Sequence, residues 1–231
     1  MNIHENAKDE VLHQEGNSYF ERNLKNGKID VSIGCQLFGD FLNDAAESIA
    51  DKKVLEIGCC YGYNLMWLCE KYGLGGYGIE PSKEAVSYGK KILADENNTR
   101  ITLKQGTADM LPFSDEYFDI VLMGFCVFWV DRKYLLRAVA EADRVLKTGG
   151  LLVTWDFDTK IPYRRKNIHN DHVPTYKYDL AKLYCENPQY SLIEKRSFSH
   201  NGKGFHKDIQ ERCALNILYK EEVEKAYIFQ D

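Results

Sequence analysis

Short apolar runs alternate with amphipathic stretches through the first two thirds of the chain. Runs rich in aliphatic or β-branched residues predict five strands, over 54–57, 77–80, 101–105, 118–123 and 151–155. Helical spacing of apolar residues predicts helices over 37–49, 65–72, 81–94 and 132–146. Ser82 is expected to cap the third of these helices. Strands that are buried on both faces and separated by helices form a parallel sheet, so the pattern predicts an α/β fold.

The last third of the chain has a different pattern. A helix is expected over 176–187, followed by strands over 191–199 and 212–219 with a glycine-containing loop at 201–204 between them. In the second of these strands, apolar residues alternate with polar or small ones, as in a strand with two unequal faces. A hairpin added to five parallel strands makes the last strand antiparallel. The pattern therefore predicts a seven-stranded, mostly parallel sheet in a single domain over 1–231.

Composition places the chain among ordinary globular proteins. Of its 231 residues, 44% are hydrophobic and 28% are charged, and the formal net charge is −5. These values exclude the disordered, fibrous and disulfide-scaffold classes. The acidic balance argues against general nucleic-acid binding. We expect no membrane-spanning segment and no secretory signal, so the seven cysteines are expected to be reduced thiols in the cytoplasm.

Polar and glycine residues follow the first three predicted strands. Glu56, Gly58 and Gly62 lie at the end of the first strand and lead into a helix. Glycines there allow a tight turn and a close approach of the backbone to a ligand. Glu80 ends the second strand, where its carboxylate can accept two hydrogen bonds from a ribose diol. Asp109 follows the third strand, where an acceptor can take the exocyclic amine of adenine. Ligands bind at such strand ends in open α/β sheets.

These stretches resemble the class I S-adenosylmethionine-dependent methyltransferases. The resemblance covers about residues 50–157 and rests on the segments 54–62, 77–82, 106–113, 118–121 and 144–152. It implies a Rossmann-like fold, S-adenosylmethionine as the cofactor and S-adenosylhomocysteine as the product. It also implies an N-terminal helical lid over 1–50, a cofactor-binding core over 51–157, and a substrate-side insert with a closing hairpin over 158–231.

The resemblance also assigns the cofactor-binding residues. Glu56 is expected to face the methionyl ammonium, Glu80 the ribose hydroxyls, and Asp109 with Met110 the adenine. The other members of the expected set are Tyr19, Arg22, Gly58, Cys59, Tyr61, Gly62, Asn64, Pro81, Gly124 and Phe125. One position departs from the family pattern, because Cys60 stands where the family usually has a second glycine. A small side chain is expected to fit there, since the position needs room rather than a positive φ.

A second, shorter resemblance concerns the acceptor of the methyl group. Segments 19–23, 64–65 and 163–179 are similar to methyltransferases of bacterial nonulosonic-acid and surface-glycan pathways. This resemblance implies a small-molecule acceptor such as a sugar or a sugar-derived metabolite. The candidate substrate-binding residues are Trp129, Arg164 and Tyr176.

No general base is evident in the core motifs. Methyl transfer from a sulfonium is an in-line displacement, and a hydroxyl acceptor also needs a base. The stretch after the fourth predicted strand, 124–131, contains no histidine. The candidate catalytic residues are therefore Asp156, after the fifth predicted strand, and His169 and His172 in the insert. Two histidines with Asp171 could ligate a divalent ion, but we expect no metal because no second ligand pair accompanies them.

Two other functional classes remain open at this point. A nicotinamide-dependent oxidoreductase would have the Gly-x-Gly-x-x-Gly spacing that a pyrophosphate requires, and Cys60 interrupts that spacing here. A degenerate methyltransferase that binds the cofactor and acts as a partner or regulator is consistent with the missing base. The prediction that follows is an enzyme acting on a small molecule, as a monomer or homodimer, without nucleic-acid or membrane partners.

Overall fold

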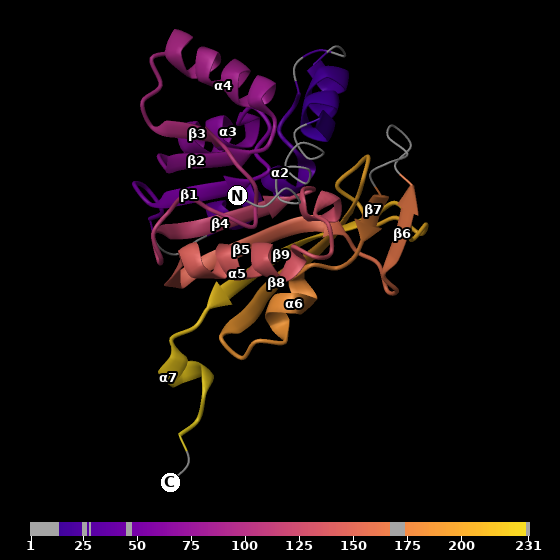
Figure 1. Cartoon of the computed structure of the whole chain (residues 1–231). Helices are drawn as coiled ribbons and strands as arrows, with labels where there is room; N and C mark the ends of the chain where they lie inside the picture. Colours follow the sequence, from indigo (N-terminus) through magenta and orange to yellow (C-terminus); the bar gives the residue numbers. More distant parts are fainter. Residues whose placement is uncertain (1–13, 25–26, 28, 45–47, 167–173, 230–231) are drawn as a thin grey trace.

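One seven-stranded sheet organises the described part of the chain, which comprises residues 14–24, 27, 29–44, 48–166 and 174–229 of the computed structural model. The strand order is β3-β2-β1-β4-β5-β9-β8 (Figure 1). The strands are β1 (Lys53–Ile57), β2 (Gly75–Glu80), β3 (Ile101–Gln105), β4 (Phe118–Gly124), β5 (Leu146–Phe157), β8 (Tyr190–Ser199) and β9 (Arg212–Lys220). The expected seven-stranded Rossmann-like sheet is confirmed.

The first five strands run parallel, and the hairpin pairs with them antiparallel. β1 lies in the middle, with Ile57 opposite Ile79 of β2 on one side and Met123 of β4 on the other. β5 pairs parallel with β4 and antiparallel with β9, and β8 completes the hairpin. The strand order reverses at β1, since β2 and β4 flank it on opposite sides. The carboxyl end of β1 is therefore the switch point at which ligands bind in this architecture.

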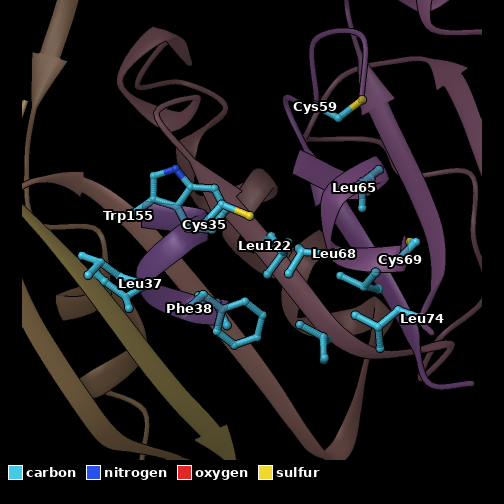
Figure 2. Close-up of a cluster of buried hydrophobic side chains, with 14 of the residues drawn as sticks. Cys35, Leu37, Phe38, Cys59, Leu65, Leu68, Cys69, Leu74, Leu122 and Trp155 are labelled. Carbon is cyan, nitrogen blue, oxygen red and sulfur yellow. The ribbon is translucent and has the colours of Figure 1, made fainter. Parts of the chain in front are cut away.

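Helices cover both faces of the sheet. On one face pack α2 (Ile33–Asn43), α3 (Tyr63–Tyr72) and α4 (Lys83–Asp95), and on the other α5 (Leu135–Val145) and α6 (Ala181–Cys185). Figure 2 shows the first apolar layer, in which Phe38 of α2, Leu68 of α3 and Trp155 of β5 are all buried. Ser82 caps α4 as expected, because its hydroxyl accepts a hydrogen bond from the amide of Ala85.

The two ends of the described chain lie differently. Residues 14–24 are helical and lie beside α4, where Phe20 packs on Tyr88 with ring centroids 5.4 Å apart (Figure 1). The short helix α7 (Val223–Ala226) extends away from the sheet. None of the helices in the described ranges is long and apolar enough to cross a membrane.

The insert after β5 differs from the expectation based on sequence. The helix expected over 176–187 is present only over Ala181–Cys185 (α6). Its expected start is wrong, because β7 (Pro174–Lys177) pairs antiparallel with β6 (Tyr163–Lys166) in a two-stranded sheet. Thr175 and Lys177 are buried, whereas their neighbours in β7 are partly exposed. This alternation is the period of a strand.

One helix boundary also shifts. α2 covers 33–43 rather than 37–49, because Ser32 caps its first turn by accepting from the amide of Cys35. The last two strands agree with their expected bounds to within one residue, so their connection spans 200–211 and includes the glycine-containing segment 201–204. Ser199 and Gly202 close a tight turn there, and the chain then continues before β9 begins.

Candidate functional site

The turn between β1 and α3 has backbone conformations that favour glycine. Gly58 and Gly62 have φ angles of 76° and 88°. A Cβ on Gly58 would lie 2.4 Å from the Cβ of Cys126, so the turn approaches the end of β4 too closely for a side chain. Gly62 is the N-cap of α3. The first amides of that helix therefore lie at the switch point of the sheet, where they favour an electron-rich ligand group.

Cys60 shares this unusual backbone conformation. Its φ angle is 52°, so the expectation that the position needs only room is wrong. A left-handed conformation costs a residue with a Cβ about 1–2 kcal/mol. The conformation is held by a hydrogen bond of 2.9 Å from the Cys60 amide to Oε2 of Glu80. The thiol group fills a place where a glycine would have only a hydrogen.

Glu80 is a buried carboxylate anchored from two sides. Its Oε2 accepts from the Cys60 amide and its Oε1 accepts from the Ser82 amide, each at 2.9 Å. Burial raises the pKa of Glu80, although both amides act in the opposite direction. Each carboxylate oxygen has a second lone pair. Glu80 is thus oriented at the end of β2 with acceptor capacity to spare.

Glu56 is the second buried carboxylate at the switch point. Its Oε1 accepts a hydrogen bond of 2.7 Å from the side-chain amide of Asn64. Its Oε2 is buried and has no hydrogen-bond partner among the described residues. Burial raises the pKa of Glu56 to about 8, although the Asn64 hydrogen bond lowers it. An unpaired buried acceptor is costly, so Oε2 marks a place where a ligand donor belongs.

A cavity of about 280 Å³ opens beside these two carboxylates. Its wall combines the strand ends with the N-terminal segment, from which Gly16 lies close to Glu80: a Cβ there would be 3.0 Å from Oε1. The acidic residues of the wall are Glu15, Asp30, Glu56 and Glu80, and none of its described residues is Lys or Arg. The cavity therefore favours a positively charged ligand over a phosphate.

Many of the residues expected from the sequence line this cavity. They are Tyr19, Glu56, Gly58, Asn64, Glu80, Pro81, Gly124, Phe125 and Trp129. Burial raises the pKa of Tyr19 to about 12, with a further contribution from Glu80, so its hydroxyl is a donor throughout the physiological range. The cavity thus gathers side chains from residues 14–24, β1, β2 and the segment after β4.

Other expected cofactor-binding residues lie outside the cavity wall. They are Arg22, Cys59, Tyr61, Gly62, Asp109 and Met110. Arg22 lies 3.4 Å from Glu15, and the Tyr61 hydroxyl donates to the carbonyl of Ile29. Asp109 is buried and lies 3.9 Å from Arg137, whereas the adjacent Met110 is exposed. The wall reaches this loop only at Gly106, Thr107 and Ala108.

The expected catalytic and substrate residues lie farther along the chain. His169 and His172 are outside the described residues. Arg164 is exposed on β6, and the ring of Tyr176 lies 4.4 Å from the guanidinium of Arg132. Asp156 is buried at the end of β5 but does not line the cavity. Burial raises the pKa of Asp156 to about 7, opposed by a hydrogen bond from the Phe157 amide and by the charges of Lys177 and Arg132.

Sequence reasoning missed several residues of the wall. Among them are Glu15, Gly16, Asp30, Ser32, Tyr63, Cys126, Val130 and Trp155. Trp155 was assigned only to the fifth strand, yet its indole lies where a Cβ on Gly34 or Gly124 would be. Gly34 and Gly124 leave the space that this large side chain occupies. They belong to α2 and β4, so no local sequence signal identifies this role of Trp155.

Comparison with known proteins finds similarity to a known domain family in the central part of the chain. Residues 55–154 match the model of the methyltransferase domain family. The chain is 33% identical to an uncharacterized protein of Haemophilus influenzae over 65% of this chain and 57% of that protein. It is 34% identical to a demethylmenaquinone methyltransferase of Halalkalibacterium halodurans over 54% of this chain and 51% of that protein. The chain thus spans little more than half the length of these relatives.

Solved structures share the fold over nearly the whole chain. The 1,6-didemethyltoxoflavin-N1-methyltransferase of Burkholderia thailandensis, solved with 1,6-didemethyltoxoflavin and S-adenosylhomocysteine, aligns with a TM-score of 0.71. The alignment covers 96% of this chain and 92% of that protein, at 14% sequence identity. The [4+2]-cyclase SpnF aligns with a TM-score of 0.67 at 15% identity, covering 93% of this chain and 97% of its own. At these identities the likeness concerns the fold, and different activities are found on it.

Proposed function

We propose that this chain, which carries a class I S-adenosylmethionine-dependent methyltransferase domain, transfers the methyl group of S-adenosylmethionine to a small-molecule acceptor. The observation that carries the proposal is the acidic cavity with the unpaired Oε2 of Glu56 in its wall. S-adenosylmethionine carries a sulfonium and an ammonium, and both positive charges suit this cavity. A dinucleotide would bring a pyrophosphate to a wall without a described basic residue.

The residues present fit the parts of this cofactor. Oε2 of Glu56 is available to accept from the methionyl ammonium, and Glu80 has lone pairs available for the ribose hydroxyls. Gly58 leaves the backbone bare beside Cys126, at the end where β4 and β1 meet. When bound, the sulfonium supplies a methyl group ready for in-line displacement. The protein's part is to orient the acceptor and exclude water.

The acceptor is proposed only as a class. The relatives include a demethylmenaquinone methyltransferase, and the first structural neighbour carries a bound toxoflavin precursor. Both names refer to flat, conjugated rings. The sugar acceptor expected from sequence rests on the short resemblance alone, as do the expectations for Arg164 and Tyr176. A panel of acceptors should therefore include flat rings as well as sugars.

Calorimetric titration with S-adenosylhomocysteine tests the proposal, with NAD as the control ligand. We expect micromolar binding of S-adenosylhomocysteine and none of NAD. Binding of NAD instead would favour the oxidoreductase interpretation. Absence of binding by either ligand would reject the cofactor, and the strained Cys60 turn would then mark a site that no longer binds a nucleoside.

A further inference from the structure

A buried lysine lies near the end of β5, at the carboxyl end of the parallel strands. Lys177 ends β7 and is only 6% exposed. No hydrogen bond or ion pair to its ammonium occurs among the described residues, although it lies near Asp156 at the end of β5. Instead, Nζ lies 2.7 Å from the centroid of the Phe157 ring. Burial of an ammonium group without a hydrogen-bond acceptor is unfavourable. A bound ligand that offered an acceptor to Nζ would remove this cost, which makes Lys177 a candidate binding residue.

The surroundings of Lys177 are aromatic. Nζ is 5.3 Å from the centroid of Phe128, and the Phe157 ring is stacked on His200 at 5.8 Å with an interplanar angle of 14°. Phe125 lies 5.6 Å from both Phe157 and His200. We call Phe125, Phe128, Phe157 and His200 the ring cluster. Rings that pack both stacked and edge to face in this way favour another flat ring as a neighbour.

The ring cluster is continuous with the cofactor cavity. Phe125 lines that cavity and also contacts the other three rings of the cluster. Its backbone is held in a left-handed conformation with φ of 46°, fixed by a hydrogen bond from its amide to the carbonyl of Trp155. Strain of this kind in a non-glycine residue is concentrated at functional sites. Phe125 thus connects the cavity with the rings that surround Lys177.

We propose that Lys177 and the ring cluster form the acceptor site, which binds a flat, conjugated ring bearing an acidic hydroxyl, and that the Lys177 amine accepts the proton of that hydroxyl. This inference rests on the proposed methyl transfer. It assigns a base that the core motifs lack, and it names a phenol or enol as the acceptor class. A sugar hydroxyl holds its proton far more tightly, and an amine would not need a base.

The proton, charge and bonds balance in this step. As the acceptor oxygen forms its bond to the methyl carbon, the hydroxyl proton passes to Nζ of Lys177. The carbon–sulfur bond breaks, and its electron pair stays on sulfur. The positive charge of the sulfonium is thereby replaced by that of the Lys177 ammonium. No metal, oxidant or further reactant is needed.

The charges around Lys177 suit this role. Burial lowers the pKa of Lys177 to about 8, and the Arg165 charge acts in the same direction. Three groups raise the pKa of Lys177 and so oppose this shift: Asp156 on β5, Cys213 on β9, and Glu211 in the loop before β9. His200 is itself held below its usual pKa by burial and by the Lys177 charge. With a pKa of about 8, roughly a tenth of the amine is neutral at pH 7, far more than for an ordinary lysine.

Binding of para-nitrophenol provides a test that needs no cofactor. The phenolate form absorbs visible light, so its fraction can be titrated against pH in the presence of excess protein. We expect the pKa of the bound probe to fall by about 1 unit, as for an acid beside a cation. Lys177→Met should abolish this fall, and Lys177→Arg should preserve it. Lys160→Met, at an exposed lysine before β6, is the matched control and should behave as the unaltered chain.

Methyl transfer then distinguishes a base from a mere positive charge. Lys177→Arg keeps the positive charge but cannot accept a proton near neutral pH. At a pH below the pKa of the bound acceptor, where the hydroxyl still carries its proton, its kcat should therefore fall at least tenfold while its probe titration is retained. If the pKa of bound para-nitrophenol is the same in Lys177→Met as in the unaltered chain, the acceptor site is overturned. Unaltered kcat in both variants would overturn the base.

Labelling of lysines with acetic anhydride at several pH values gives an independent measurement on the folded chain. Mass spectrometry should show that Lys177 reacts at a lower pH than Lys160 once corrected for accessibility. A titration of Lys177 at the usual lysine pKa contradicts the inference. The proposed function fails separately, through loss of S-adenosylhomocysteine binding in the unaltered chain. If the unaltered chain binds S-adenosylhomocysteine, and the Lys177 variants match it in probe titration and in kcat, only this inference is rejected.

Discussion

The backbone amide of Cys60 donates a hydrogen bond to Oε2 of Glu80 over 2.9 Å. This bond joins the turn after β1 to the end of β2, which are neighbours in the sheet but distant along the chain. It holds Cys60 in a left-handed conformation and at the same time orients the Glu80 carboxylate. The conformation of the turn and the orientation of the Glu80 carboxylate therefore depend on each other.

Replacing Glu80 by alanine is expected to weaken binding of S-adenosylhomocysteine at least tenfold. A hydrogen bond to a charged group contributes about 1.5–3 kcal/mol, and the ribose would lose its acceptor. Isothermal titration calorimetry measures the change. Glu84→Ala, on the exposed first turn of α4, is the matched control and should bind normally. Equal affinities for the two variants would reject the placement of the ribose at Glu80.

Cys60 is the position for a test of backbone strain. Cys60→Val should destabilise the fold by about 1–3 kcal/mol, because a β-branched residue tolerates the left-handed conformation poorly. Cys60→Gly should be neutral or slightly stabilising, since relief of strain offsets the greater freedom of the unfolded chain. Urea unfolding of both variants gives the comparison. If valine proved as stable as glycine, the left-handed conformation at this residue would be wrong.

Glu56 should make stability fall as the pH rises. Its pKa is raised from 4.5 to about 8 by burial, so the folded chain retains a proton that the unfolded chain has lost. Between these values the folded state binds more protons, and its free energy of unfolding declines with pH. The contribution is fully present below about pH 4.5 and lost above about pH 8.

Glu56→Gln isolates this effect, because glutamine has nothing to titrate. Unfolding of both proteins in urea at pH 5 and pH 8 should show a smaller loss in the variant. Asp156, whose pKa is raised to about 7, contributes alike to both and cancels in the difference. Parallel pH profiles would mean that Glu56 ionises at its ordinary pKa. Calorimetry in buffers of different ionisation enthalpy should also show proton release on ligand binding that the variant lacks.

Gly34 should tolerate no side chain. An added Cβ would lie 2.2 Å from Cγ of Trp155, whose indole is fully buried in the layer seen in Figure 2. Overpacking of this kind costs about 1–3 kcal/mol. Gly34→Ala should therefore lower the urea midpoint and, since Trp155 also lines the cavity, weaken ligand binding. Gly204→Ala is the control, because nothing lies within 4 Å of its Cβ position.

The central sheet and its acidic strand ends could be predicted because the apolar runs in the sequence coincide with the segments that are buried in the fold. The apolar run that ends at Glu56 and the one that ends at Glu80 are strands buried on both faces, so burial and period indicate the same elements. Ser82 is likewise predictable, because an N-cap depends on the residues that immediately follow it. These features lie within the part of the chain that matches the methyltransferase domain family.

The acceptor side could not be predicted in the same way. The strand at Lys177 depends on pairing with Tyr163, and no local propensity identifies that partner. The φ of Cys60 depends on a carboxylate from the next strand. Trp155 was identifiable only as a strand residue, since its role as a wall depends on glycines from two other elements. Long-range contacts of this kind leave no periodic signal.

The strand order has a consequence for how this chain can change over time. The carboxylates at the cavity, Glu56 and Glu80, come from consecutive strands, whereas Lys177 and His200 lie after β5. Trp155 lies in β5 between them and packs against Gly34 and Gly124, which both precede it in the sequence. Substitutions beyond residue 155 can therefore change the surroundings of Lys177 and His200 without altering the two carboxylates at the cavity. The chain is in this sense divided along its sequence into a part that supplies the cavity carboxylates and a part that supplies Lys177 and His200.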